Sequence, residues 1–320
     1  MLRRAVATVS LMCAAVGAPA QDYPNRPIRL IVPFAPGGAT DIPARLVAPK
    51  LTEALGQPVI IENRTGAGGI IGIDVAAKSQ PDGYTVLMAT NAELVMHPSI
   101  YPKLPYDVSK DFIPVSIMLE SPMLLVTSAS SSFNSVADVL AAARAKPGSV
   151  TYSTAGTGST SHVLTEMLAL QAGVKLLHVP YKGGAPASAA VSTGEVAVAL
   201  LNLGSALNFV KTGKAKALAV TSAKRHPNFP DWPTAIEAGI PGFAEEIWIG
   251  MAVPAGVRRD IVDKLSAEVA KALRAPDVRE RLVQLGNDPL GTTPEEAAAR
   301  IKREFPRYSA AIKQANIRPE

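Results

Sequence analysis

Glycine-rich turns between strand-like runs and helical patterns constrain the fold of this chain more than any other feature. Four such turns occur: Gly37-Gly38, Gly66–Gly69, Gly156–Gly158 and Gly183-Gly184. Strand, turn and helix follow one another at a spacing that predicts a mostly parallel sheet with helices on its faces. In such a sheet the turns lie together at the carboxyl ends of the strands, where ligands bind.

The elements fall into two blocks and a helical tail. The first block holds strands predicted over Ile28–Phe34, Pro58–Asn63 and Tyr84–Ala89. The second, from about residue 120, holds strands predicted over Met123–Thr127, Val150–Ser153, Leu176–Pro180, Val196–Leu201 and Ala217–Thr221. Helices are predicted over Val257–Leu273, Asp277–Leu285 and Pro294–Ala315, and Gly239–Val253 is predicted to be irregular. The chain is expected to cross between the blocks near residues 118–122 and 221–227.

The four turns favour the binding of an anion. Glycine lets a ligand approach the backbone, and the first turn of a helix offers unpaired N–H groups and a partial positive charge. Glycine in one such place also serves turn geometry alone, but four in corresponding places indicate a site. If the blocks form two lobes, the four helix starts face one cleft, which suits a small ligand with a carboxylate at each end. The nearby side chains are neutral except for Asp41, which is expected to cap the first helix.

The first twenty residues have the pattern of a secretory signal peptide. Arg3 and Arg4 precede an apolar run, and Ala18-Pro19-Ala20 fits the cleavage site, so the mature chain is expected to start at Gln21 in the periplasm. Cys13, the only cysteine, lies in this segment, so no disulfide or cysteine ligand is expected afterwards. Without it, 30 basic residues face 27 acidic ones with no basic cluster, which argues against a nucleic-acid partner. No later segment is apolar over the ~20 residues of a membrane span.

Enzyme motifs match poorly, so neither catalytic residues nor a metal or other cofactor is expected. The four histidines lack metal-ligand spacing, and no nucleophile elbow or Walker A motif occurs. The turn Gly66–Gly72 has the pattern GxGxxxG and departs from the dinucleotide motif GxGxxG. One enzyme alternative stays open, an exported hydrolase that uses His162 with Ser159 or Ser161. It lacks an acid beside the histidine.

Several longer motifs resemble the Bug-type solute-binding proteins of the tripartite tricarboxylate transporter family. They are Ile31–Asp41, Glu62–Gly69, Gly156–Ser159 with His162, Val179–Gly184, and Leu218–Thr221 followed by Arg225. Their order and spacing hold over essentially the whole mature chain.

The resemblance implies an α/β fold of the type II periplasmic binding proteins. Two lobes, each a mostly parallel sheet flanked by helices, are joined by two crossing strands and close around a ligand like a Venus flytrap. We expect one lobe from residues 21–120 and 222–320 and the other from residues 121–221. The implied function is a receptor, not an enzyme, that binds a small organic acid, aromatic acids included, and delivers it to a two-component membrane permease. We expect a monomer.

The resemblance also implies the binding residues. The turns of the first lobe would offer backbone amides to one carboxylate, and those of the second lobe would select the distal end. The predicted ligand-binding residues are Phe34, Ala35, Gly37, Gly38, Ala39, Asn63, Ala67, Gly68, Gly69, Asn91, Thr154, Thr157, Ser159, Tyr181, Lys182, Gly183, Asn202 and Trp248. Relatives often carry an acidic residue near the end of the strand Val196–Asn202. Leu200-Leu201-Asn202 is neutral here, which disfavours an amino-bearing ligand.

Overall fold

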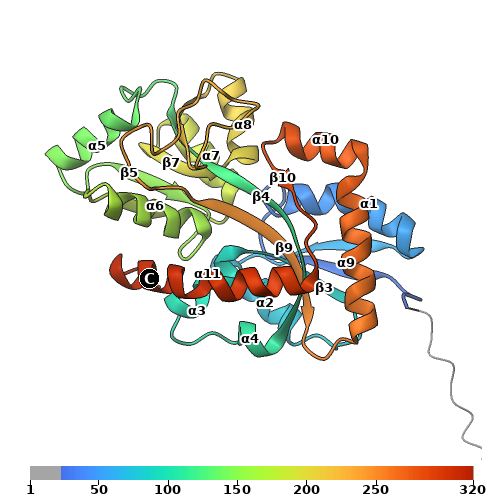
Figure 1. Cartoon of the computed structure of the whole chain (residues 1–320). Helices are drawn as coiled ribbons and strands as arrows, with labels where there is room; N and C mark the ends of the chain where they lie inside the picture. The colour runs from blue at the N-terminus through green and yellow to red at the C-terminus, as the bar shows by residue number, and fades with distance from the viewer. Residues whose placement is uncertain (1–22, 320) are drawn as a thin grey trace, which may run out of the picture.

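The computed structural model describes residues 23–319, and the predicted signal peptide 1–20 lies outside this part of the chain. Its strands form one curled sheet in the order β2-β1-β3-β9-β4-β7-β5-β6, and β8 and β10 also pair with β4 (Figure 1). The strands are β1 (Ile28–Val32), β2 (Val59–Asn63), β3 (Thr85–Thr90), β4 (Phe112–Ser128), β5 (Thr151–Thr154), β6 (Leu177–Pro180), β7 (Val198–Asn202), β8 (Ala215–Val220), β9 (Glu246–Pro254) and β10 (Asp288–Pro289).

Helices cover the sheet on both faces (Figure 1). They are α1 (Asp41–Leu55), α2 (Ile70–Ala77), α3 (His97–Ile100), α4 (Val108–Asp111), α5 (Val136–Ala145), α6 (Thr160–Gln171), α7 (Gly184–Thr193), α8 (Leu203–Lys211), α9 (Arg259–Arg274), α10 (Pro276–Gln284) and α11 (Pro294–Gln314). A short 3₁₀ turn, η1 (Ala67–Gly69), precedes α2, and a π-helical segment, η2 (Ala92–Met96), follows β3. None of the helices within residues 23–319 is both long and apolar enough to span a bilayer.

Strand β4 joins two lobes. It pairs antiparallel with β9 over Phe112–Pro122 and with β7 and β8 over Met123–Ser128. On one side β1 pairs in parallel with β2 and β3, and on the other β5 pairs in parallel with β6 and β7. The two-lobed α/β fold is therefore confirmed, with the parallel pairing confined to three strands of each lobe and the long strands β4 and β9 running between them (Figure 1).

The first lobe, built on β1 to β3, buries both faces of its strands. Alternate residues of a strand point to opposite faces, so Leu30 packs with α1 and α9 while Ile31 packs with α2 and η2. A strand that is covered on both faces needs a continuous apolar run. The sequence Ile-Arg-Leu-Ile-Val of β1 meets this need except at Arg29, which pairs with Glu62.

The second lobe, built on β5 to β8, is arranged in the same way. Its sheet lies between α7 and α8 on one face and α5 and α6 on the other. The segment 222–245 also packs against this lobe, since Phe229 and Trp232 contact its core and the Ala235 N–H donates to the Val220 carbonyl.

The prediction for the segment Gly239–Val253 is wrong. This segment was expected to be irregular, but it contains most of β9. Gly250 interrupts the apolar pattern there for a packing reason. A Cβ at this position would lie 2.7 Å from the carbonyl oxygen of Ser116 in β4. The glycine therefore permits close pairing of the two long strands instead of ending one of them.

Candidate functional site

Two side chains hold the turn between β1 and α1. The Asp41 carboxylate accepts hydrogen bonds from the Gly37 N–H at 2.8 Å and from Asn63 Nδ2 at 2.9 Å. Asn63 Nδ2 also donates to the Phe34 carbonyl at 2.9 Å. Burial alone would raise the pKa of Asp41, but hydrogen bonds from Arg45, Gly37 and Asn63 lower it. Thr40, not Asp41, occupies the N-cap position, and its side chain makes no capping bond.

The glycine-rich turns of the two lobes face each other. A Cβ at Gly68 would lie 2.7 Å from the carbonyl oxygen of Thr157, and one at Gly183 would lie 3.6 Å from Cβ of Ala35. The Tyr101 hydroxyl donates to the Thr157 carbonyl at 2.8 Å. The structure therefore has the two lobes in contact at the turns, as in a closed receptor.

A small cavity of about 60 Å³ lies between the lobes, and we call it the inner cavity. Five predicted residues line it, namely Phe34, Gly38, Ala39, Ser159 and Asn202. Its other lining residues include Thr40, Thr90, Glu93, Ala155 and Ser205.

A second cavity of about 550 Å³ adjoins the first, because Phe34 and Ala155 line both. We call it the outer cavity. Its volume falls in the range of about 300–1,000 Å³ of small-molecule sites. Seven predicted residues line it: Phe34, Ala67, Gly68, Gly69, Thr157, Tyr181 and Lys182. The turns Phe34–Ala39 and Ala67–Gly69 were expected to bind the same carboxylate. Apart from Phe34, which lines both cavities, the first turn lines the inner cavity and the second lines the outer one.

Other predicted residues support the turns without lining either cavity. Ala35 and Gly183 face each other beside the outer cavity, and Gly37 and Asn63 belong to the hydrogen-bonded turn described above. Thr154 is buried, and its hydroxyl contacts His178 Nε2 at 2.7 Å.

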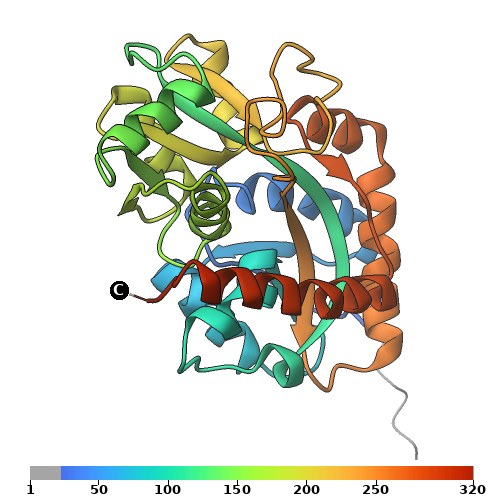
Figure 2. The same ribbon diagram turned by 60° about the vertical axis from the view of Figure 1, so that its left-hand side comes forward.

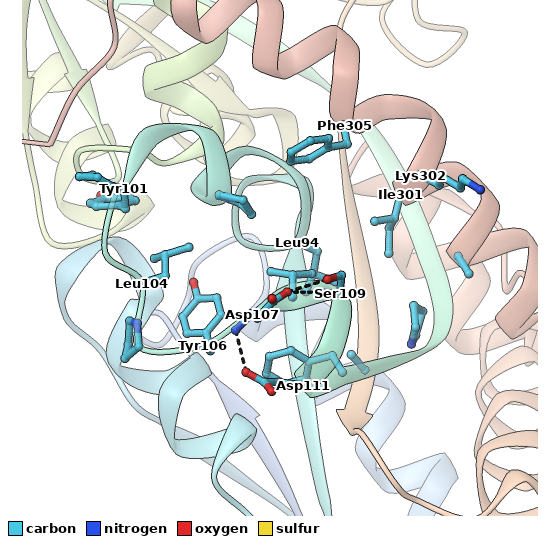
Figure 3. A pocket seen from close by; sticks show the side chains of 18 residues that line it. Leu94, Tyr101, Leu104, Tyr106, Asp107, Ser109, Asp111, Ile301, Lys302 and Phe305 are labelled. Carbon is cyan, nitrogen blue, oxygen red and sulfur yellow. Dashed lines mark hydrogen bonds between the residues drawn. The ribbon is translucent and has the colours of Figure 1, made fainter.

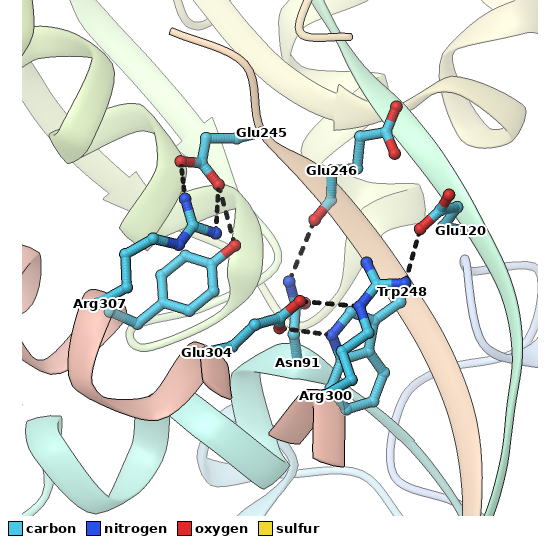
Figure 4. Close-up of polar contacts among 9 residues, drawn as sticks. Asn91, Glu120, Glu245, Glu246, Trp248, Arg300, Glu304 and Arg307 are labelled. Carbon is cyan, nitrogen blue, oxygen red and sulfur yellow. Dashed lines mark hydrogen bonds and ion pairs between the residues drawn. The ribbon is translucent and has the colours of Figure 1, made fainter. Parts of the chain in front are cut away.

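Asn91 and Trp248 are buried and line neither cavity. Figure 4 shows their polar contacts. Asn91 Nδ2 donates to the Glu246 carbonyl at 3.2 Å and its Oδ1 accepts from the Thr160 hydroxyl at 2.9 Å. Trp248 Nε1 donates to Glu304 of α11 at 2.7 Å. Arg300 extends this network to Glu120 of β4 at 2.7 Å, so α11 is tied to both long strands. Trp248 was predicted to line the cleft, but it is buried behind α11, which crosses both long strands (Figure 2).

Thr40, Glu93 and Ser205 are among the lining residues of the inner cavity that were not predicted. Within the described chain, their side-chain atoms Thr40 Oγ1, Glu93 Oε1 and Ser205 Oγ are buried without a hydrogen-bond partner, and so is Asn202 Nδ2. Buried polar groups are nearly always paired, so four unpaired ones at one cavity indicate a site for a polar ligand or water. The one signal in the sequence was an acid, Glu93, in the otherwise apolar run Ala92–Met96.

His162 is not arranged as a catalytic base. Its Nδ1 accepts the Gly158 N–H at 3.1 Å, and its ring stacks on His178 with 3.9 Å between centroids. Burial, with a smaller contribution from His178, lowers the pKa of His162 to about 3. Ser159 donates instead to the Gly156 carbonyl at 2.6 Å. Within residues 23–319 there is also no cluster of three or more acidic, histidine or cysteine side chains that could hold a metal.

A larger cavity, about 950 Å³, lies elsewhere (Figure 3). It is bordered by the loop from η2 to α4, with Tyr101 and Tyr106, and by Ile301 and Phe305 of α11. None of the predicted ligand-binding residues lines it.

Comparison with known proteins decides the family. The family model described as the tripartite tricarboxylate transporter family receptor matches residues 43–317. The chain belongs to this family.

Its relatives in the family cover nearly the whole chain. Protein BugT of Bordetella pertussis is 37% identical over 98% of this chain and 97% of its own length. The solved structure of R. palustris Rpa4515 with adipate is 35% identical, with a TM-score of 0.90 over 93% of this chain and 100% of that one. MatC of Rhodopseudomonas palustris, solved with bound malate, is 34% identical, with a TM-score of 0.86 over 91% and 100% of the two chains. The solved structure of a periplasmic transporter is 37% identical, with a TM-score of 0.89 over 92% of this chain and 99% of that chain. The resemblance noted in the sequence is therefore confirmed.

Proposed function

We propose that this protein is a periplasmic receptor that closes on a small organic acid and delivers it to a two-component membrane permease. Relatives that are about one-third identical over the whole chain were solved with adipate and malate, which are both dicarboxylic acids. One related structure is a periplasmic transporter. An N-terminal signal peptide accounts for export in this proposal, and the receptor acts as a monomer.

The observation that carries the proposal is the convergence of neutral donors on the cavities between the lobes. Thr40, Asn202 and Ser205 each bring an unpaired buried polar atom to the inner cavity. Hydroxyl and amide donors without a neighbouring cation suit a carboxylate, which accepts several hydrogen bonds at once. The glycine turns Ala67–Gly69 and Gly156–Thr157 line the outer cavity, where backbone N–H groups would meet the distal end.

We assign the binding residues by cavity. One carboxylate is held in the inner cavity, where the predicted residues Phe34, Gly38, Ala39, Ser159 and Asn202 are joined by Thr40 and Ser205. The distal end is selected in the outer cavity by Ala67–Gly69, Thr157, Tyr181 and Lys182. Ala35, Gly37, Asn63, Thr154 and Gly183 shape the turns.

The predicted lobes were residues 21–120 with 222–320, and residues 121–221. The change of partners of β4 at Met123 supports the first boundary of this division. Since Phe229 and Trp232 pack against the core of the second lobe, we propose that residues 222–245 belong to that lobe and move with it. The proposed first lobe is therefore residues 21–120 with 246–320.

Thermal shift against a panel of organic acids, with adipate and malate included, tests the proposal. A ligand that binds only the native state adds about 2.7 kcal/mol of stability at a hundredfold excess over its Kd. We expect a rise in Tm with one or more acids and recovery of the acid unchanged after prolonged incubation, as measured by NMR. A panel without any shift contradicts the receptor, and conversion of the acid to a product supports an enzyme instead.

A further inference from the structure

Glu93 lines the inner cavity, but the proposed binding of an acid gives its carboxyl group no role. It lies in η2, directly after β3, and its side chain is 0% exposed. Oε2 accepts hydrogen bonds from the Thr90 N–H at 2.6 Å and the Thr90 hydroxyl at 2.8 Å. Oε1 has no partner within the described residues and borders the inner cavity. A π-helical segment often marks a functional site.

No cation balances this carboxyl group in residues 23–319. On its own segment the titratable neighbours are His97 and, beyond it, Tyr106, which are hydrogen-bonded to each other at 3.2 Å. Asp41, the first residue of α1, is already engaged with Arg45 and Asn63. From the second lobe, the end of β7 and the starts of α6 and α8 bring only neutral polar groups to the cavity, namely Ser159, Thr160, Ser161, Asn202 and Ser205. An ionised Glu93 would therefore be a buried charge without a counter-ion, which is costly.

A ligand carboxylate in the inner cavity makes this cost larger. The cavity has a volume of only about 60 Å³, so a carboxyl group that enters it comes close to the lining residues. A carboxylate placed there to accept from Thr40, Asn202 and Ser205 lies beside Glu93 Oε1. Two carboxylates at hydrogen-bond distance cannot both be ionised, and one of them holds a proton.

We propose that Glu93 is a specificity-determining residue that carries a proton in the bound state and donates it in a hydrogen bond to the ligand carboxylate. The proton comes from solvent and resides on Oε1 of Glu93, so that binding of the acid is coupled to uptake of up to one proton. This inference rests on the proposed function. It selects a carboxylate over an ammonium or a cationic group at this position, because a protonated carboxyl offers a donor.

The pKa of Glu93 lies in the range in which binding of the acid can be coupled to proton uptake. Burial raises the pKa of Glu93 to about 7, against partial compensation by the Thr90 hydrogen bonds. Near neutral pH the free receptor therefore contains both forms, and the ligand selects the protonated one. Above this pKa, one coupled proton weakens binding about tenfold for each pH unit.

Isothermal titration calorimetry with adipate and malate, between about pH 6 and pH 9, tests the coupling. We expect the wild-type Kd to rise about tenfold per unit above about pH 7 and proton uptake to appear in buffers of different ionisation enthalpy. Glu93→Gln keeps a neutral donor and should bind across the range with a constant Kd. Glu53→Gln, an exposed acid on α1, should retain the wild-type pH dependence.

The outcomes separate this inference from the proposed function. A wild-type Kd that is constant with pH overturns the proton coupling and leaves the receptor intact. Loss of binding in Glu93→Gln at every pH, with a constant wild-type Kd, means that Glu93 acts as an ionised acceptor, which also overturns it. Absence of binding by any acid of the panel removes the proposed function and this inference with it.

Melting curves without ligand show whether Glu93→Gln folds and whether Glu93 is protonated in the wild type. Because the pKa of Glu93 is raised above the value of about 4.5 for a free glutamate, the wild type should lose stability relative to Glu93→Gln as the pH rises from about 4.5 to about 7. Parallel melting curves over this range would show that Glu93 is not protonated at neutral pH and would overturn the proposal.

Discussion

The hydroxyl of Tyr101 donates to the carbonyl oxygen of Thr157 at 2.8 Å and so joins the two lobes across the rim of the outer cavity. Tyr101 follows α3 in the first lobe, and Thr157 lies in the glycine turn before α6 in the second. This bond exists only while the turns are in contact. It therefore contributes to closure and not to the stability of either lobe alone.

Tyr101→Phe should shift the receptor toward the open form. A hydrogen bond of this kind contributes about 0.5–1.5 kcal/mol, so we expect the affinity for the bound acid to fall about two- to tenfold. Titration calorimetry and the radius of gyration from X-ray scattering measure the two effects. Tyr84→Phe is the control, because Tyr84 bonds to Asn25 within one lobe. Equal affinity and equal radius in Tyr101→Phe and wild type would refute this role.

Gly68→Ala should abolish closure by a steric clash. Its Cβ would lie 2.7 Å from the Thr157 carbonyl oxygen, and Gly68 has a φ of +62°. Gly173→Ala is a matched control, since Gly173 has a φ of +64° and nothing within 4 Å of its Cβ position. Both variants should lose about 1 kcal/mol of stability from backbone strain. Only Gly68→Ala should lose ligand binding in thermal shift, and binding by both variants would remove this turn from the site.

Asn202→Asp should weaken binding of the acid while the cap of α8 is kept. Asn202 Oδ1 caps α8 by accepting the Gly204 N–H at 3.0 Å, and a carboxylate serves as well in that place. The substitution replaces the unpaired Nδ2 donor of the inner cavity with a negative charge. We expect the affinity for the acid to fall about 100-fold or more, and Tm to fall as well because the charge is buried beside Glu93 without a counter-ion. Asn208→Asp, on the exposed face of α8, should leave the affinity unchanged. A variant Asn202→Asp that binds like wild type would exclude Asn202 from the site.

Glu62→Gln should lower stability in a pH-dependent way. Hydrogen bonds from Arg29, together with Arg64, lower the pKa of Glu62 to about 2 against the opposing effect of burial. A lowered pKa stabilises the fold above about pH 4.5, and this contribution disappears as the pH falls toward about 2. Since the side chain of Glu62 is 25% exposed, we expect a loss of only about 1–2 kcal/mol at neutral pH. Urea unfolding at about pH 7 and pH 3 measures it. A loss of the same size at both pH values would contradict the ionic origin.

The sequence predicted those site residues whose position follows from the order of strands, turns and helices along the chain. Phe34, Gly38 and Ser159 were expected at the cleft because glycine turns after parallel strands share one edge of a sheet, and the structure brings them together. Glu93 and Trp248 depend on distant contacts instead. Glu93 faces the cavity because of the π-helical path of η2, and Trp248 is covered by α11, whose Glu304 lies 56 residues later. The neighbouring sequence carries a signal only for Glu93, as an acid in the apolar run Ala92–Met96.

The sharing of β4 between the lobes means that neither lobe has a complete sheet without the other. Its first eleven residues pair with β9, and the rest pair with β7 and β8. A fragment that ends within β4 would have an unpaired sheet edge, which promotes aggregation. Truncation at the lobe boundary should therefore give an insoluble product instead of a smaller folded domain.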